Sequence, residues 1–293
     1  MHTRPFGRTG LVVSALGLGA GQVGAAALDD GVAARLLNTA LDLGITLVDT
    51  ARGYGVSEER IGRHLAHRRG EFVLSTKVGY GIDGVPDWTP EAVARGIDEA
   101  LARLRTDVLD IVHLHSCPLD TLRHGGVVEA LVRARDQGKV RVAAYSGENE
   151  ELDWAVHDGR LGSVECSINL FDQDGLTRSL PAASRHGLGV IAKRPLGNAP
   201  WRFAQRPVGD YAEAYWLRQQ ALAYAHDGLA WGEFALRFTA FAPAVGSAIV
   251  GTSSVEHLRH NVALAERGPL PDALVAATRQ RWQQVDRGWR GEL

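Results

Sequence analysis

The chain has 293 residues, of which 45% are hydrophobic and 23% charged, and its formal net charge is -2. This balance is typical of a globular protein with a substantial core, and it argues against the basic field that nucleic-acid or anionic-membrane binding uses. The two cysteines, Cys117 and Cys166, lie in separate segments and form no disulfide framework. No apolar run approaches the ~20 residues that span a bilayer, and no secretion signal is visible, so we expect a cytoplasmic protein.

Eight short apolar runs alternate with amphipathic stretches along the chain. The runs lie at 14–19, 45–49, 72–77, 109–115, 140–146, 163–169, 189–194 and 247–251. Helical patterns lie between them, for example at 31–44, 89–105 and 253–265. Parallel strands buried on both faces have such continuous apolar runs, and eight βα units over this length are typical of a (β/α)8 TIM barrel. We therefore predict a single barrel domain over residues 1–293.

A doubly wound open sheet is the alternative fold. The first unit contains the glycine-rich segment GLGAGQVG at 17–24, but no compact G-x-G-x-x-G opens a helix there. The next helical pattern begins only at residue 31, which favours the barrel. A long insertion, LGNAPWRFAQRPVGDY at 196–211, follows the seventh run.

Three of the predicted strands end in polar side chains that can take part in chemistry. Asp49 ends the second run, Lys77 the third and His115 the fourth. In a barrel the catalytic groups lie at the carboxyl ends of the strands, so we expect these side chains to face one small volume. Tyr54 follows on a glycine-flanked turn and is the fourth candidate.

Each of these residues also has a structural interpretation. Asp49 could cap the next helix, His115 could be a satisfied core histidine, and Tyr54 could simply pack its ring. Lys77 is harder to explain in this way, because the chain has only three lysines and uses arginine on its solvated faces. A lysine at the end of a buried strand requires a partner. The coincidence of all four residues favours a functional site.

Seven stretches resemble the aldo-keto reductase family. They are 4–19, 48–62, 72–79, 109–118, 138–147, 169–173 and 247–262, in the family's order. The resemblance implies a barrel whose bottom is closed by a hairpin of the first dozen residues. It also implies that Asp49, Tyr54, Lys77 and His115 form the catalytic tetrad, and that the cofactor is a nicotinamide dinucleotide bound without a Rossmann fold.

The implied reaction reduces an aldehyde or ketone to an alcohol, or runs in reverse. The cofactor supplies a hydride, and the protein must supply a proton. A free phenol has a pKa of about 10, so Tyr54 requires a nearby cation to be an acid near neutrality. We expect Lys77 to be that cation, Asp49 to hold it, and His115 to orient the carbonyl.

In the family, the residues that bind the cofactor lie at or after the ends of several strands. The serine of the usual Ser-Asn pair is Ser146, while Glu165 replaces the usual glutamine and Lys193 the usual stacking aromatic. We expect Glu165 to lie beside the nicotinamide or to pair with Lys193, and Lys193 to reach the 2′-phosphate. NADP(H) is the predicted cofactor, with NAD(H) as the alternative. The predicted cofactor residues are Gly19, Ser146, Glu165, Lys193, Pro195, Leu196, Gly251, Thr252, Ser253, His257 and Asn261.

Three other functions stay open. His113 and His115 form an H-x-H that could ligate a metal in a hydrolase, although the resemblance implies no metal. Lys77 could form a Schiff base in an aldolase. A cofactor-binding module that senses redox state is the third alternative.

The predicted partner is a small-molecule carbonyl or alcohol, with neither nucleic acid nor membrane, and the sequence leaves the oligomeric state open. Specificity in barrels belongs to the loops beyond the strands. Trp88 and Trp201 lie in two such loops and are the candidate substrate-binding residues, although both could equally be loop anchors.

Overall fold

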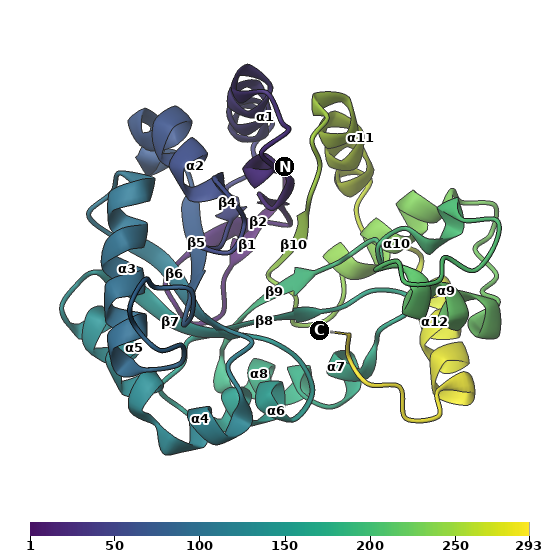
Figure 1. Ribbon diagram of the computed structural model, residues 1–293. Coiled ribbons are helices and arrows are strands. Elements are labelled where there is room, and N and C mark those ends of the chain that lie inside the picture. Colours follow the sequence, from purple (N-terminus) through teal and green to yellow (C-terminus); the bar gives the residue numbers. More distant parts are fainter. Residues whose placement is uncertain (293) are drawn as a thin grey trace.

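The computed structural model describes residues 1–292 and contains a closed barrel of eight parallel strands surrounded by helices (Figure 1). The strands are β3 (Leu16–Gly19), β4 (Leu47–Asp49), β5 (Val73–Val78), β6 (Leu109–His115), β7 (Val140–Ser146), β8 (Ser163–Ser167), β9 (Gly189–Lys193) and β10 (Ser247–Val250). They follow one another around the barrel in chain order, and β10 pairs with β3 to close it. The predicted (β/α)8 barrel is therefore confirmed, and the open sheet is excluded.

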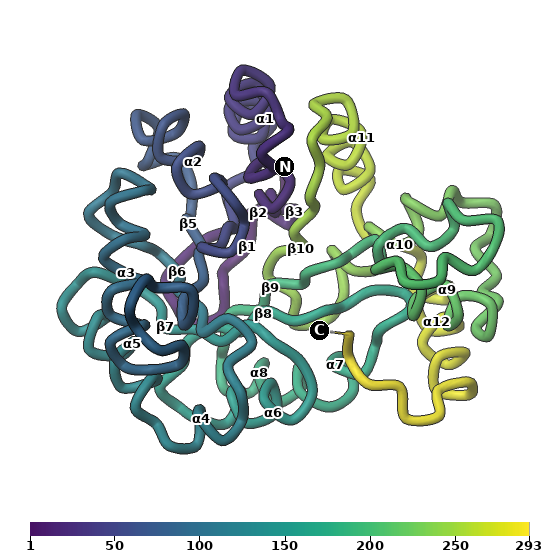
Figure 2. The backbone as a smooth tube through the Cα atoms, viewed as in Figure 1, coloured from purple at the N-terminus to yellow at the C-terminus, as the bar shows by residue number. Residues whose placement is uncertain are grey.

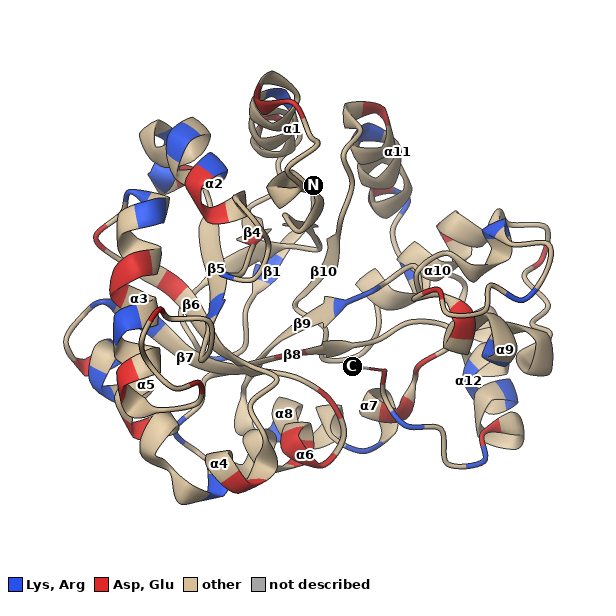
Figure 3. Ribbon diagram, viewed as in Figure 1, with Lys and Arg blue, Asp and Glu red and all other residues tan. Residues whose placement is uncertain are grey.

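Helices cover the outside of the barrel. They are α1 (Asp30–Asp42), α2 (Ser57–Leu65), α3 (Pro90–Leu104), α4 (Leu119–His124), α5 (Gly126–Asp136), α6 (Asn149–His157), α7 (Asp174–Thr177), α8 (Leu180–His186), α9 (Glu213–Leu222), α10 (Trp231–Ala240), α11 (Val255–Glu266) and α12 (Asp272–Val285). The side chains of Asp29, Thr89 and Ser254 accept a hydrogen bond from the first turn of α1, α3 and α11, so they start these helices as N-caps. Figure 3 shows both charge signs interspersed over the outer helices.

No helix in the described part of the chain has the length and apolarity needed to cross a membrane. Three short 3-10 helices, η1 (Gln22–Gly24), η2 (Ala66–Glu71) and η3 (Pro200–Arg202), complete the helical elements. The last of them lies in the predicted insertion after β9, which continues into α9.

An antiparallel hairpin of β1 (Thr3–Pro5) and β2 (Val12–Ser14) precedes the barrel. Phe6 lies in the turn of this hairpin and is fully buried. It belongs to an apolar cluster that includes Leu47 and Val73, the first residues of β4 and β5. A Cβ atom on Gly189 or Gly246 would lie 2.3 or 2.7 Å from the Phe6 ring, so the ring fills the space that these glycines leave. The expected hairpin therefore closes the amino-terminal end of the barrel.

The chain ends at the opposite, carboxyl-terminal face of the barrel. Residues 286–292 run back from α12, and Figure 2 shows the C-terminal end near the centre of the barrel view. The amide of Gly291 donates to Asn149 Oδ1 (2.9 Å), and the carbonyl of Glu292 accepts from Ser167 Oγ (3.4 Å) and from the Arg194 guanidinium. The tail therefore contacts the loops and strand ends that surround the site.

The role of the hairpin can be tested by removing its buried ring. We expect Phe6→Ala to lower the free energy of unfolding by about 3–5 kcal/mol, because it leaves a cavity between strands that cannot collapse fully. Urea denaturation followed by circular dichroism measures the change. Val12→Ala is the matched control, since Val12 is 54% exposed on the same hairpin. A Phe6→Ala loss no larger than that of the control would show that the ring does not seal the barrel.

Candidate active site

Asp49 and Lys77 form an ion pair inside the barrel at the ends of adjacent strands. Asp49 is the last residue of β4, and Lys77 is the residue before the last in β5. The Lys77 Nζ lies 2.5 Å from Asp49 Oδ2 and donates to the carbonyl of Thr50 at 3.0 Å, while Ser75 Oγ donates to the other Asp49 oxygen at 2.7 Å. Both charged side chains are shielded from solvent, at 0% and 1% exposure.

Glu165 brings a second carboxylate to the same ammonium. Its Oε2 lies 3.3 Å from Lys77 Nζ, although β8 and β5 are separated by two strands around the barrel. The contact therefore crosses the barrel interior. Glu165 thus pairs with a nearby cation, but this cation is Lys77 and not Lys193, whose Nζ lies 3.2 Å from Glu148.

The two carboxylates titrate differently around Lys77. Burial and the charge of Glu165 raise the pKa of Asp49 to about 7, against the effect of Lys77. Burial also raises the pKa of Glu165, but Lys77 and His113 outweigh it and hold that pKa at about 2. Burial lowers the pKa of Lys77, yet its two acidic neighbours outweigh it, so the ammonium persists. Of the two carboxylates, Asp49 is therefore the one that takes up a proton more readily.

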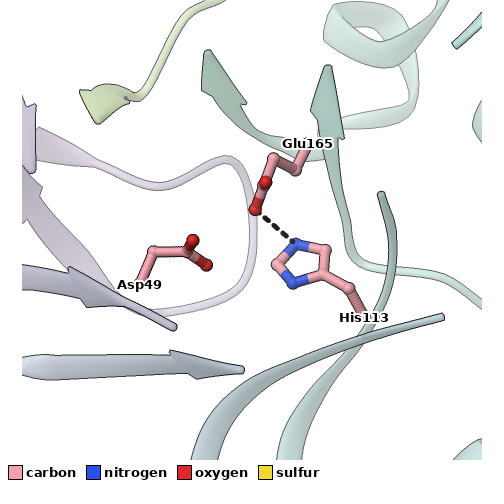
Figure 4. Close-up of side chains that lie close together, drawn as sticks. All are labelled: Asp49, His113 and Glu165. Carbon is pink, nitrogen blue, oxygen red and sulfur yellow. Dashed lines mark ion pairs between the residues drawn. The ribbon is translucent and has the colours of Figure 1, made fainter. Parts of the chain in front are cut away.

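His113 lies beside this cluster rather than beside His115. Figure 4 shows Asp49, His113 and Glu165 converging, with 4.0 Å between His113 Nε2 and Glu165 Oε2. Ligand atoms of these three residues lie within 4.8 Å of one another, as a metal site would require. The Lys77 ammonium, however, contacts both carboxylates and supplies the cation between them. The arrangement therefore does not favour the metal-dependent hydrolase.

Tyr54 lies on the loop between β4 and α2, and its ring reaches this cluster. The Lys77 Nζ is 5.2 Å from the ring centroid, and the His115 ring meets it edge-on at 6.0 Å. Gly55 has a φ of +56°, and a Cβ on Gly24 would lie 1.6 Å from the Tyr54 carbonyl, so glycine is required at both positions. The structure thus brings together Asp49, Tyr54, Lys77 and His115, as expected.

The pKa of Tyr54 differs from the expectation. Lys77 alone would lower it, but burial and the charges of Asp49 and Glu165 outweigh this and raise the pKa of Tyr54 to about 12. The expectation rested on one cation and one compensating carboxylate, whereas two carboxylates contact the ammonium. Tyr54 is therefore a phenol throughout the neutral range.

His115 has a partner that the sequence analysis missed. The hydroxyl of Tyr80 lies 2.7 Å from His115 Nδ1, and the two rings stack with their centroids 5.5 Å apart. Burial and Lys77 lower the pKa of His115 to about 3, so the imidazole is neutral. Tyr80 lies two residues after β5, in a loop that we expected to affect only substrate specificity. Loops have no sequence periodicity, so no pattern predicts that Tyr80 contacts His115.

A groove of about 510 Å³ leads away from Asp49 and Tyr54 along the carboxyl ends of the strands. Its other lining residues are Gly19, Gly21, Gln22, Arg194, Pro195, Leu196, Asn198, Ala199, Arg202, Tyr211, Ile249, Val250 and Gly251. Four predicted cofactor residues, Gly19, Pro195, Leu196 and Gly251, thus line it together. Four further lining residues, Gln22, Arg194, Arg202 and Tyr211, were not predicted, although Arg202 and Tyr211 lie in the insertion at 196–211.

The other predicted cofactor residues are spread around the groove. Ser146 ends β7 and is buried, and its Oγ has no hydrogen-bond partner within residues 1–292. Thr252 accepts from the amide of Ser254 at 3.0 Å and so shapes the turn before α11. Ser253 is exposed in this turn, and His257 is exposed in the first turn of α11. Asn261 lies one helical turn further along α11 and is half-buried.

The two candidate substrate tryptophans have different surroundings. Trp88 packs against Tyr80, with ring centroids 5.7 Å apart, and so belongs to the wall behind His115. Trp201 stacks on Trp231 at 6.0 Å and contacts Phe171. It is not among the residues that line the groove, which favours its role as a loop anchor.

Comparisons with known proteins agree with this geometry. A family model described as Aldo/keto reductase family matches residues 15–283. The chain is 31% identical to L-galactose dehydrogenase of Arabidopsis thaliana, over 90% of this chain and 88% of that protein. It is 30% identical to D-threo-aldose 1-dehydrogenase from a Pseudomonas species, over 87% and 90% respectively.

A solved structure also has this fold. The holo form of an aldo-keto reductase from Bacillus halodurans superposes with a TM-score of 0.82, at 24% identity and over 96% of both chains. The family model covers most of the chain, and the sequence matches extend over nearly all of both relatives. The chain therefore belongs to the aldo/keto reductase family of oxidoreductases.

Proposed function

We propose that this protein reduces an aldehyde or ketone with NADPH, or oxidises the corresponding alcohol, and that Tyr54 transfers the proton. The observation that carries the proposal is the placement of Tyr54 and His115 around the buried Asp49–Lys77 pair, where the groove begins. This places a proton donor, a cation and a neutral imidazole at one end of a groove of about 510 Å³.

The groove fits a nicotinamide dinucleotide. The unpartnered Oγ of buried Ser146 is available for a carboxamide, and the α11 N-terminus offers free N–H groups to a phosphate. Arg202 adds an exposed guanidinium with no ion pair among residues 1–292. When bound, the nicotinamide supplies or accepts the hydride. The extra positive charge along the groove favours NADP(H) over NAD(H).

The protein's own residues manage the proton and the polarisation of the carbonyl. Tyr54 donates its phenolic proton to the oxygen that becomes an alkoxide. Lys77 remains an ammonium beside the Tyr54 ring and stabilises negative charge as it develops there. Asp49 holds Lys77 in place, and neutral His115 donates a hydrogen bond to the carbonyl oxygen.

A sugar or a sugar-like polyol is the proposed substrate class. The two relatives named above take their names from L-galactose and a D-threo-aldose, both of which are sugars. A carbonyl and alcohol panel that includes aldoses and simple aldehydes, followed by NAD(P)H absorbance, tests the proposal. Absence of turnover across the panel in both directions and with both cofactors would contradict it.

The first variant removes the proposed acid. We expect Tyr54→Phe to bind NADPH normally and to lower kcat by at least about a hundredfold, the scale of losing general-acid catalysis. Lys77→Met should cause a similar loss, because no cation would then stabilise the developing phenolate. Steady-state kinetics measures kcat, and fluorescence titration measures the affinity for NADPH, so catalysis and cofactor binding are measured separately. Retention of most of the turnover in Tyr54→Phe would refute the assignment.

The second pair of variants concerns the cofactor phosphates. We expect Arg202→Ala to weaken NADPH binding by roughly 1–3 kcal/mol, because a charge-assisted contact is lost. Lys193→Ala is the matched control, since Lys193 is paired with Glu148, and it should not change the ratio of the NADPH and NADH dissociation constants. Isothermal titration of both cofactors measures these values. An unchanged NADPH affinity in Arg202→Ala would exclude the arginine from the site.

The third variant removes the second carboxylate. At pH 8 the cluster of Asp49, Lys77 and Glu165 has a net charge of -1, which favours the positively charged oxidised nicotinamide. We expect Glu165→Gln to lower the ratio of the NADPH to the NADP+ dissociation constant several-fold at pH 8. The change should be smaller at pH 5, because Asp49, with its pKa of about 7, then carries a proton in wild type. The variant lacks the Glu165 charge that raises this pKa, so its Asp49 loses the proton more readily and the net charges of the two clusters differ less.

Titration of both redox forms into wild type and Glu165→Gln measures this ratio. The same substitution removes one of the anions that raise the pKa of Tyr54, so alcohol oxidation should begin at lower pH in the variant. Ser163→Ala, two residues earlier on the same face of β8, is the neutral control. An unchanged ratio at pH 8 would exclude the electrostatic role and leave the role of Tyr54 unaffected.

A further inference from the structure

Among residues 1–292, the Tyr80 hydroxyl makes one hydrogen bond, to the imidazole of His115. Its hydroxyl lies 2.7 Å from Nδ1, while no hydrogen bond to Nε2 forms within residues 1–292. The two rings are also stacked, with an angle of 29° between their planes. Of the two nitrogens of His115, one is thus held by the protein and the other is free for a ligand.

The position of the Tyr80 hydroxyl is fixed from two sides. Trp88 packs behind the Tyr80 ring, and Gly79, with a φ of +131°, leaves room for the indole, since a Cβ there would lie 2.1 Å from it. On the other side, a Cβ on Gly53 would lie 3.0 Å from the Tyr80 oxygen. The phenol is therefore enclosed between its own loop and the loop that carries Tyr54.

The protons at this contact can be assigned from the chemistry of the two groups. A neutral imidazole carries one proton, on either Nδ1 or Nε2, and the partner of one nitrogen decides which. Burial raises the pKa of Tyr80, so its hydroxyl keeps a proton to donate. The low pKa of His115 leaves a nitrogen that accepts this proton in a hydrogen bond.

We propose that Tyr80 is a positioning residue that donates to His115 Nδ1 and thereby keeps the imidazole proton on Nε2. Only this tautomer can donate a hydrogen bond to a carbonyl oxygen from the free nitrogen. The opposite tautomer would present a lone pair and repel that oxygen. The inference rests on the proposed function, in which His115 orients the carbonyl.

The test observes the tautomer directly. Nitrogen-15 NMR of histidine-labelled protein at pH 8, without cofactor or substrate, distinguishes a bare Nδ1 from a protonated one, and His115→Asn assigns the signals. We expect wild type to have His115 protonated on Nε2, and Tyr80→Phe to have a mixture of tautomers. Tyr145→Phe removes a hydroxyl from another buried tyrosine, which bonds to the Cys117 carbonyl, and should leave the tautomer unchanged.

The kinetic consequence follows from the loss of one hydrogen bond. We expect Tyr80→Phe to lower kcat about three- to tenfold in the reduction direction with cofactor affinity unchanged. The phenyl ring keeps the stacking on His115 and Trp88, so a purely structural role would leave both the tautomer and kcat unaltered. Thermal unfolding of the variant separates a loss of fold from a loss of the hydroxyl.

A second variant acts on the same contact without changing Tyr80. Gly53→Ala adds a methyl group beside the hydroxyl and should also increase the fraction of His115 protonated on Nδ1. Nδ1 protonation in wild type, or identical tautomer populations in wild type and Tyr80→Phe, would overturn the proposal. If wild type turns over no carbonyl, the proposed function fails, and the NMR result still decides whether Tyr80 fixes His115.

Discussion

The arrangement of the site depends on one buried ammonium. Lys77 has no exposed side-chain surface, and removing such a charge from water costs several kcal/mol unless it is paired and hydrogen-bonded. Asp49, Glu165 and the carbonyl of Thr50 supply those partners from three directions. Because each partner has to reach the same nitrogen, the positions of β4, β5 and β8 are fixed relative to one another. Tyr54 and His115 are then arranged around a charge that cannot move.

The barrel provides the conditions that this charge requires. Beneath the cluster, residues of the hairpin and of the strands form an apolar layer around Phe6. Lys77 has no exposed side-chain surface, so the electrostatic effects among Lys77, Asp49 and Glu165 are screened only weakly. The groove opens on the other side, so a ligand approaches the cluster from the carboxyl ends alone. One end of the barrel thus stabilises the fold, and the other provides the reactive groups.

Sequence periodicity predicted the parts of this site that depend on single strands. The eight runs and their polar last residues located Asp49, Lys77 and His115, and the glycine-flanked turn after Asp49 located Tyr54. The family resemblance marked Glu165 as a site residue, but it did not identify the partner of Glu165, because Lys77 lies across the barrel interior on β5. Tyr80, Arg202 and the tail contacts of Asn149 depend on loop conformations and on residues up to 142 positions apart. No local pattern encodes such contacts.

The raised pKa of Tyr54 is compatible with the proton-donor role that we propose for it. The relevant comparison is with the alkoxide that forms from the carbonyl, and not with bulk water at neutral pH. Water itself has a pKa of about 15.7, and a simple alcohol is comparably weak, so a developing alkoxide takes a proton even from a phenol with a pKa of about 12. The second carboxylate, Glu165, affects the reverse reaction instead. Alcohol oxidation needs Tyr54 as a phenolate base, and a Tyr54 with a raised pKa is seldom deprotonated. The same carboxylate favours a positively charged nicotinamide. In the proposed reaction Glu165 would therefore oppose alcohol oxidation through the proton and favour it through binding of the oxidised cofactor. The balance between these two effects would set the pH range in which each direction is efficient.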